Sequence, residues 1–291
     1  LLCQPRRAGD RRAGGDGPMT VDVHTGAAGL TVERLTVRYS GTVAVDRLDL
    51  GAPCGRITGL IGPNGAGKTT TFNACSGFVT PAEGRIHLFG ADVTRLGPAQ
   101  RARRGLGRTF QRMELIHAMT VAENLVTARD ARAAGANPLR QVFTGRAERQ
   151  RTGEAVDEAL ERCGLMPLAG RPVASLSTGE RRLVELARAC VSDFRLLLLD
   201  EPSSGLDPSE TEQFGAVLRT LVEERGVGIL LVEHDMALVM SVCQYLYVLD
   251  FGVLIAEGSP HQVQANPVVR AAYLGDDVGV GDHIGLEVGP R

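Results

Sequence analysis

Residues 62–69 combine glycines, a lysine and a threonine in a spacing that suits phosphate binding. They read Gly-Pro-Asn-Gly-Ala-Gly-Lys-Thr and match the pattern G-x-x-x-x-G-K-[ST]. Glycines let successive backbone N–H groups converge on a phosphate, the Lys68 ammonium can reach the β- and γ-phosphates, and the Thr69 hydroxyl can ligate Mg²⁺. The pattern therefore predicts a nucleotide-binding loop, against the alternative of a chance glycine-rich turn. The residues expected to contact the nucleotide here are Gly62, Pro63, Asn64, Gly65, Ala66, Gly67, Lys68, Thr69 and Thr70.

Lys68 is the only lysine among the 32 basic residues of the chain. Schiff-base chemistry, a guanine-reading Asn-Lys-x-Asp pocket and a lysine-rich nucleic-acid tail each need a lysine, and the phosphate loop already uses the only one. The formal net charge of −2 also argues against polyanion binding as the main task. We therefore expect no nucleic-acid partner.

Two carboxylates follow a run of leucines at positions 196–199. Ligand sites of parallel sheets lie beyond the carboxyl ends of the strands. Asp200 is therefore expected to hold Mg²⁺, directly or through water, and Glu201 to orient and deprotonate an attacking water. A solvated Asp-Glu pair at an ordinary strand end is the alternative, and the phosphate loop is evidence against it.

His234 and Gln111 are candidates because of the residues around them. His234 follows the apolar run at 229–232, and its imidazole could sense a γ-phosphate. Gln111 follows Arg108-Thr109-Phe110, and its amide can reach the Mg²⁺ or the water. A single histidine at a strand end is more often structural, and Gln111 alone would be an ordinary polar residue.

The stretch Leu-Ser-Thr-Gly-Glu at 176–180 begins a predicted helix. Ser177 and Glu180 fit the S-x-x-E capping box, which is a sufficient structural reason for both. The same helix start can bind an anion, with the Ser177 hydroxyl and the Gly179 N–H contacting a γ-phosphate in the field of the helix dipole. The two interpretations are compatible, because a helix N-terminus has several free N–H groups.

The segments that carry these residues alternate between strand and helix patterns. Predicted strands cover 30–39, 43–50, 56–61, 196–199, 229–232, 245–249 and 253–256, with a turn at Ser40-Gly41; predicted helices cover 68–76, 148–163 and 180–191. This alternation implies an α/β fold with a mostly parallel sheet covered on both faces. Residues 112–180 lack clear strands and predict a helical insertion. Within them, residues 128–151 have no clear pattern, and we expect a solvated loop there.

The ordered set of motifs resembles the nucleotide-binding domain of ABC transporters. The set is the phosphate loop, Gln111, the 176–180 signature, the leucine run with its two carboxylates, Ser-Gly-Leu-Asp at 204–207, and His234. The resemblance covers about residues 29–275. It implies a P-loop NTPase of ABC type, with a mostly parallel RecA-like sheet, an N-terminal antiparallel β subdomain and a helical subdomain at about 112–185. It also implies that Tyr39 stacks on adenine and that Asp207 lies at a dimer seam.

In that family two such domains dock head to tail, and ATP lies between the P-loop of one domain and the signature of the other. The resemblance therefore implies an ATP-hydrolysing subunit that uses ATP and Mg²⁺. Its opening and closing would move partner membrane permeases through the surface near Gln111. The second ATPase subunit can be a copy of this chain or a paralogue. Peripheral attachment to the cytoplasmic face of the plasma membrane follows from the same resemblance.

Three stretches resemble the ATPases of branched-chain (hydrophobic) amino-acid importers. They are Arg-Thr-Phe-Gln at 108–111 with Met-Thr-Val-Ala-Glu-Asn-Leu at 119–125, Val-Glu-His-Asp-Met at 232–236, and Asn-Pro at 266–267 leading to Ala-Tyr-Leu-Gly at 272–275. The likeness implies uptake of branched-chain amino acids through two permeases, with an extracytoplasmic solute-binding protein in the complex. Urea or short-amide importers and lipopolysaccharide-type exporters share much of the pattern, and a non-transport soluble ABC ATPase is a further alternative.

The signature departs from the commonest Leu-Ser-Gly-Gly-Gln form, because Thr178 and Glu180 replace Gly and Gln. The Glu180 carboxylate either adds a negative charge near a bound phosphate, which would weaken ATP binding, or turns back to cap the helix. The sequence leaves both possibilities open.

The ends of the sequence have a different composition from its centre. Residues 1–28 are rich in Gly, Arg and Asp and predict a disordered extension upstream of a true start at Met19, and 276–291 predict a flexible tail. The six cysteines are scattered, which favours reduced thiols over disulfides or zinc. No uncharged apolar run approaches the roughly 18–20 residues that a membrane span needs.

Overall fold

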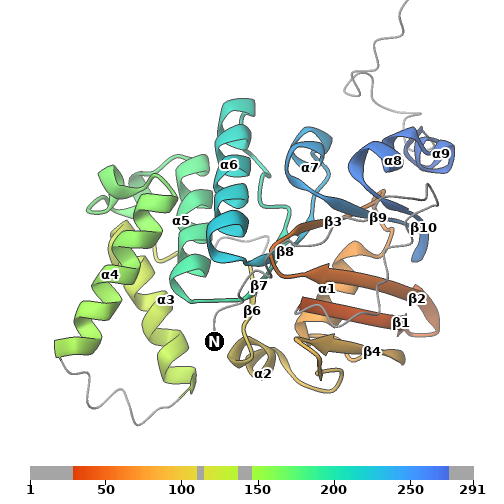
Figure 1. Cartoon of the computed structure of the whole chain (residues 1–291), viewed down its shortest axis with the longest axis horizontal. Coiled ribbons are helices and arrows are strands. Elements are labelled where there is room, and N and C mark those ends of the chain that lie inside the picture. The colour runs from red at the N-terminus through yellow and green to blue at the C-terminus, as the bar shows by residue number, and fades with distance from the viewer. Residues whose placement is uncertain (1–28, 110–114, 137–145, 275–291) are drawn as a thin grey trace, which may run out of the picture.

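The computed structural model describes residues 29–109, 115–136 and 146–274. Figure 1 shows the two sheets with α1 toward the right of the molecule and the helices α3, α4 and α5 grouped at its left. Gln111 and the two terminal segments, 1–28 and 276–291, lie outside the described residues, and so do the expectations made for them.

The first sheet is antiparallel and has the strand order β2-β1-β4-β5. The predicted turn is confirmed, since Ser40 and Gly41 separate the first two strands and both have positive φ, 48° and 90°. Positive φ at both central residues is what a type I′ hairpin turn requires. Two further strands complete the sheet and were not predicted. The four strands are β1 Gly29–Tyr39, β2 Thr42–Pro53, β4 Glu83–Leu88 and β5 Ala91–Asp92.

The second sheet has the order β10-β9-β3-β8-β7-β6, and only its β9–β10 hairpin is antiparallel. Every residue of β3, β7 and β8 is buried. Strands that are buried on both faces are typical of parallel sheets, so the predicted mostly parallel sheet is confirmed. The strands are β3 Ile57–Ile61, β6 Leu106–Arg108, β7 Leu196–Asp200, β8 Gly228–Val232, β9 Tyr245–Asp250 and β10 Val253–Gly258.

The helices that connect these strands begin and end at capping residues that the sequence carries. The predicted first helix ends where Gly77 adopts φ 84°, and the helix predicted from Glu180 begins instead at Thr178, after Ser177. The helices are α1 Lys68–Ser76, α2 Pro98–Arg103, α3 Val121–Ala136, α4 Arg146–Arg162, α5 Thr178–Val191, α6 Pro208–Arg225, α7 Met236–Val242, α8 Pro260–Ala265 and α9 Pro267–Leu274, with short 3₁₀ turns at Met166–Leu168 and Val173–Ser175.

The predicted helical insertion is present as α3, α4 and the start of α5 (Figure 1). The expected solvated loop at 128–151 is wrong in its described parts, because α3 continues to Ala136 and α4 already begins at Arg146. The segment is rich in alanine and arginine, which favour helix by propensity even where no apolar periodicity marks one.

The second sheet lies between two hydrophobic clusters. Alternate residues of β7 belong to different clusters: Leu197 and Leu199 pack with α3–α7, whereas Leu196 and Leu198 pack with α1 and the first sheet. This arrangement follows from the alternation of side chains along a strand. It fixes the end of β7, and hence Asp200, from both sides.

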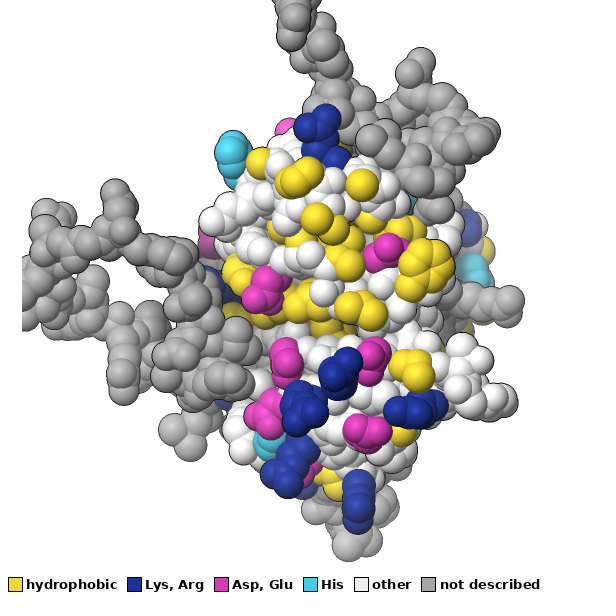
Figure 2. Space-filling model, turned by 90° about the vertical axis from the view of Figure 1, so that its right-hand side faces the viewer, with side chains coloured by type: hydrophobic (Ala, Val, Ile, Leu, Met, Phe, Trp, Pro, Cys, Tyr) yellow, Lys and Arg dark blue, Asp and Glu magenta, His cyan; other side chains and the backbone are white. Residues whose placement is uncertain are grey.

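Figure 2 shows the side of the molecule that lies at the right of Figure 1, where hydrophobic side chains form a band. Among the exposed apolar residues, Phe251 is 87% exposed at the turn between β9 and β10. In the ranges that the structure describes, every helix is too short or too polar to cross a membrane.

Candidate functional site

The candidate site lies at one edge of the second sheet, where three neighbouring parallel strands end. β8 pairs with both β3 and β7, and Val232 lies opposite Leu60 on one side and Asp200 on the other. The residues that follow these strands therefore leave the sheet together. They are the phosphate loop after β3, Glu201 after β7 and His234 after β8.

The phosphate loop depends on its glycines. Gly62 and Gly67 have φ of 151° and 99°, and a Cβ on Gly62 would lie 2.1 Å from the Leu249 carbonyl oxygen. The turn after β9 supports the loop, since Gly252 N–H donates to the Ala66 carbonyl at 3.0 Å. The helix that follows has no side-chain cap and no acidic residue in its first turn. Its N–H groups and dipole therefore remain available to an anion.

The Lys68 side chain folds back over the loop. Its Nζ donates to the carbonyl oxygens of Gly62 at 2.6 Å and Pro63 at 2.8 Å, and the residue is only 9% exposed. The neighbouring Thr69 is exposed and Thr70 is half-buried at the start of α1. Because the two carbonyls hold the Lys68 ammonium at the loop, a small rotation of the side chain would bring it to a phosphate bound there.

Asp200 and Glu201 end β7 in different environments. Asp200 is 2% exposed, and its Oδ2 accepts a hydrogen bond from Arg108 at 3.3 Å. Its Oδ1 is buried and has no hydrogen-bond partner among the described residues. Burial raises the pKa of Asp200, while the nearby positive charges of Arg108 and Lys68 oppose that rise. Glu201 has φ 47°, a conformation that is costly for a residue with a side chain.

This arrangement fits a divalent cation. An ionised carboxylate oxygen that is buried without a partner costs free energy unless a ligand binds it. The Asp200 Oδ1 atom meets that description, and the Thr69 hydroxyl at the start of α1 is a second oxygen donor of the kind that Mg²⁺ prefers. The residues present are therefore compatible with the expected metal.

His234 lies at the end of β8 with its side chain 66% exposed. The residue before it, Glu233, is 1% exposed. The sequence predicted no role for Glu233, which is part of the Val-Glu-His-Asp-Met stretch at 232–236. Its carboxylate accepts from Ser203 N at 2.8 Å, Ser203 Oγ at 2.7 Å and His234 N at 3.1 Å. Glu233 thus joins the loop after Glu201 to the loop of His234. An acidic residue at the end of an apolar strand was the signal that could have found it.

The signature segment begins α5 with a complete capping box. Glu180 N–H donates to Ser177 Oγ at 3.1 Å, and Ser177 N–H donates to Glu180 Oε2 at 2.7 Å. The Glu180 carboxylate therefore turns back to the helix, which is the second of the two possibilities that the sequence left open. The Ser177 hydroxyl accepts a bond and keeps its own proton for another acceptor.

The signature also contacts the start of α6. A Cβ on Gly179 would lie 2.3 Å from Glu210 Oε1. Glu210 in turn forms a capping box with Asp207, whose Oδ1 accepts from Glu210 N at 2.8 Å. The close approach explains why residue 179 is a glycine. It brings the start of α5, with the exposed Ser177 and the buried Gly179, next to the start of α6, where Asp207 is exposed.

The predicted site residues therefore form two groups. Lys68, Asp200, Glu201 and His234 lie at the edge formed by β3, β8 and β7, and the signature lies with Asp207 where α5 and α6 begin. Tyr39 ends β1 and is 45% exposed. Gln111 lies outside the described residues.

Comparison with protein families identifies the chain. Residues 45–204 match the model described as ABC transporter, and residues 253–279 match the model described as branched-chain amino acid ATP-binding cassette transporter. The chain belongs to the ABC transporter family. The expected α/β fold of ABC type is confirmed, and so is nucleotide binding as a property of the chain.

Curated relatives of this ABC protein cover most of its length. The high-affinity branched-chain amino acid transport ATP-binding protein BraF of Pseudomonas aeruginosa is 40% identical over 250 residues, which are 85% of this chain and 98% of the relative. The corresponding protein LivG of Escherichia coli is 40% identical over 254 residues, with the same two coverages. The lipopolysaccharide export system ATP-binding protein LptB of Acidithiobacillus ferridurans is 36% identical over 247 residues, 85% of this chain and 97% of the relative.

Solved structures agree with the fold of this ABC protein. The ADP conformation of MJ1267, an ATP-binding cassette of an ABC transporter, superposes with a TM-score of 0.73 at 30% identity, over 85% of this chain and 98% of that one. CbiO1 from Clostridium perfringens, part of the ABC transporter complex CbiONQ, gives a TM-score of 0.71 at 27% identity, over 86% and 99%. The chain is thus an ATPase subunit of a transporter, and membrane permeases are its partners.

Proposed function

We propose that this ABC subunit hydrolyses Mg²⁺-bound ATP to power the import of branched-chain amino acids. The geometry that carries the chemistry is the sheet edge where Lys68, Asp200 and Glu201 lie beyond neighbouring strands. The cargo is supported by the two 40% identical relatives and by the match of residues 253–279. That C-terminal match favours amino-acid import over lipopolysaccharide export, whose ATPases are also relatives at 36% identity.

Different residues bind the phosphates, the adenine and the metal ion. The backbone of residues 62–70 and the Lys68 ammonium hold the phosphates, and Tyr39 stacks on adenine. Mg²⁺ would be held by Asp200 Oδ1 and the Thr69 hydroxyl, with Gln111 as a further ligand, and would neutralise charge on the phosphate oxygens. A second ATPase subunit, either a copy of this chain or a paralogue, closes the site with its own signature residues and D-loop acid. In this chain those residues are Ser177, Gly179 and Asp207.

Hydrolysis needs one proton transfer and one displacement. A water held between Glu201 and His234 attacks the γ-phosphorus in line with the bond to the bridging oxygen, and its proton passes to the Glu201 carboxylate. The bond between the γ-phosphorus and the bridging oxygen breaks, and ADP keeps that oxygen. The phosphate no longer links the two subunits, so the seam opens.

The chain is proposed to divide into an ATPase domain at 29–275, with a helical subdomain at about 112–185, and short extensions at both ends. The helical subdomain and the segment around Gln111 would contact two permeases from the cytoplasmic side of the membrane. An extracytoplasmic solute-binding protein would deliver the cargo to them. The chain itself would stay at the membrane surface.

Two measurements test the proposal. Because each site needs two chains, phosphate release per subunit by the isolated protein should rise with protein concentration, and a concentration-independent rate would contradict sandwich catalysis. Reconstituted with the permeases and the binding protein of its transporter, the protein should drive ATP-dependent uptake of labelled leucine in vesicles. Uptake of urea instead, or outward movement of lipid, would contradict the proposed cargo but not the proposed ATPase activity.

A further inference from the structure

Arg108 lies next to Asp200 because of strand order. β6 is the edge strand beside β7, and Arg108 pairs in register with Leu198, close to the carboxyl end of β7. Its guanidinium NH2 approaches Asp200 Oδ2 at 3.3 Å. The two side chains are 11% and 2% exposed, so the pair is largely removed from water.

The position of the Arg108 guanidinium is also fixed from the other side, by the helix that follows the phosphate loop. Its NH1 donates to Asn73 Oδ1 at 2.8 Å and to Ser76 Oγ at 2.7 Å, both on α1. Its Cζ lies 5.9 Å from the Phe72 ring centre and 5.6 Å from that of Phe78. Arginine stacks on aromatic faces and donates in fixed directions, so these contacts hold the group in place independently of Asp200.

The pairing divides the Asp200 carboxylate between two tasks. Oδ2 accepts from Arg108, whereas Oδ1 is buried without a hydrogen-bond partner among the described residues. A carboxylate with one oxygen bound by a preorganised guanidinium has its plane and direction set, so its other oxygen always points the same way. Ligands of metals are generally oriented in this manner by the groups behind them.

We infer that Arg108 is a positioning residue for the proposed cation site, holding Asp200 so that Oδ1 faces the divalent ion before it binds. The inference rests on the proposed function, because it concerns the same site. It gives a reason for an arginine three positions before Gln111. It also joins the end of β6 to both α1 and β7.

A purely structural ion pair would hold β6, β7 and α1 together and do nothing more. The two roles differ in what they change. A structural pair affects the stability of the protein with and without ligand alike. A positioning residue affects the response to the divalent cation and leaves cation-free nucleotide binding almost unaltered.

The test compares Arg108→Met and Arg108→Lys with the wild-type full-length protein. Binding of a fluorescent ATP analogue is measured without divalent cation and across a Mg²⁺ series, and Mn²⁺ binding in the presence of ATP is measured by electron paramagnetic resonance. For Arg108→Met the cation concentration at half-effect should rise by about tenfold. Cation-free nucleotide affinity should stay within twofold. The lysine variant keeps the charge but not the fork, and should recover only part of the loss.

Arg225→Met is the matched control. Arg225 is also a partly buried arginine paired with an aspartate, Asp193, at 2.8 Å, but Asp193 precedes the start of β7, whereas Asp200 ends that strand. It should alter thermal stability and leave Mn²⁺ affinity unchanged. Asn73→Ala removes one anchor of Arg108 and keeps the arginine, so it should weaken Mn²⁺ binding by a smaller factor than Arg108→Met. This variant provides the test if Arg108→Met fails to fold.

Unchanged Mn²⁺ affinity in a folded Arg108→Met or Asn73→Ala protein would overturn the inference. The wild-type arm separates this failure from that of the proposed function. If divalent cations do not change nucleotide binding by the wild-type protein at all, the proposed metal site itself is wrong.

Discussion

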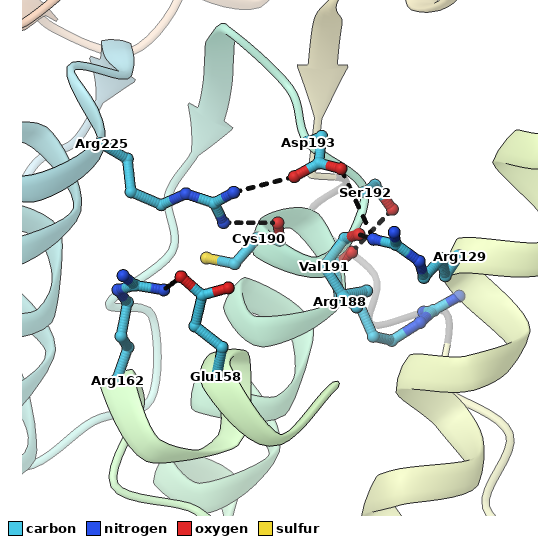
Figure 3. Close-up of polar contacts among 9 residues, drawn as sticks. All are labelled: Arg129, Glu158, Arg162, Arg188, Cys190, Val191, Ser192, Asp193 and Arg225. Atoms are coloured by element: carbon cyan, nitrogen blue, oxygen red, sulfur yellow. Dashed lines mark hydrogen bonds and ion pairs between the residues drawn. The ribbon is translucent and has the colours of Figure 1, made fainter. Parts of the chain in front are cut away.

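The two ends of α5 show how differently one helix can use its polar groups. At its N-terminus the exposed Ser177 bonds to residues of its own first turn, with Glu180 completing the capping box. At its C-terminus, side chains from two other helices bind the chain (Figure 3). Arg129 of α3 donates to the Val191 carbonyl at 3.0 Å, and Arg225 of α6 donates to the Cys190 carbonyl at 3.2 Å.

We call Arg129, Arg225, Asp193 and the carbonyls of Cys190 and Val191 the arginine cluster. Asp193 accepts from both arginines, at 2.8 Å from Arg225 and 3.5 Å from Arg129, and adopts φ 52°. Beside the arginine cluster, Arg162 of α4 pairs with Glu158 and, at 2.9 Å, with Glu224 of α6. The cations satisfy the negative end of the helix and tie the helical insertion to α6.

The difference separates polar groups that hold the fold from polar groups that await a ligand. In the arginine cluster each charge has a partner from the protein. At the nucleotide edge, Asp200 keeps an unpartnered oxygen, and the N-terminus of α1 has no side-chain cap. The predictions below change one group at a time on each side of this contrast.

The largest effect is expected for Glu201→Gln. The amide cannot take a proton from water, so phosphate release should fall by about 10²–10⁴-fold. ATP binding should persist, and ATP should trap the closed dimer, which size-exclusion chromatography would detect. The matched change in the arginine cluster, Asp193→Asn, should leave turnover per folded molecule within twofold. Wild-type turnover in Glu201→Gln would mean that the base is another group.

Lys68→Met should follow in size. Losing a charged donor to the phosphates costs about 1.5–3 kcal/mol, so ATP affinity should fall by roughly 10- to 150-fold. Titration with a fluorescent ATP analogue measures it. In the wild-type protein, an amine-reactive ATP analogue should label the Lys68 side chain, and excess ATP should protect it. Labelling that ATP fails to block would contradict the position assigned to this lysine.

Ser177→Ala tests whether the open end of α5 does more than cap a helix. The lost cap should lower the free energy of unfolding by about 1 kcal/mol. The lost phosphate contact should reduce turnover by roughly tenfold, as expected for a hydrogen bond to a charged group. Ser259 is a matched control, since it caps α8 through the same kind of box with Gln262. Ser259→Ala should cost similar stability without slowing hydrolysis; equal slowing in both variants would leave Ser177 a cap only.

Arg225→Met should have the smallest effect on function. Removing its bonds to Asp193 and Cys190 should lower the free energy of unfolding by about 1 kcal/mol, since Asp193 is 57% exposed and water screens the pair. The midpoint of thermal unfolding should drop by roughly 2–4 °C. Turnover of the folded protein should not change. A tenfold loss of turnover would show that the arginine cluster takes part in ATP hydrolysis. It would then not differ from the nucleotide edge as a purely structural region.

The residues at the nucleotide edge of the sheet could largely be predicted from the sequence. The phosphate loop, Asp200 and Glu201 each follow an apolar strand run, and local pattern fixes both the strand and the residue that leaves it. The cap at Ser177 is equally local. The start of α6 carried the same signal in Asp207, Pro208 and Glu210, and reading it as a cap would have predicted that helix.

The missed features depend on contacts between distant parts of the chain. The partner of Arg108 follows from β6 lying beside β7, which no local pattern specifies, and β6 itself has too few residues to show a period. β4 was missed because its buried side chains, Ile86 and Leu88, give only a weak alternation. The arginine cluster joins α3, α5 and α6 and could not be predicted before their packing was known.

The β9–β10 turn has a consequence for modularity. Gly252 holds the phosphate loop through Ala66 and also accepts from Asp46 N–H at 2.8 Å. The segment that matches the branched-chain amino acid ATP-binding cassette transporter model begins at residue 253, directly after that turn. A chimera that exchanges C-terminal segments between transporters should therefore be joined after Gly258, because a junction before Val253 would give the nucleotide loop a foreign support. The segment matched by the branched-chain model thus begins next to the turn that supports the phosphate loop.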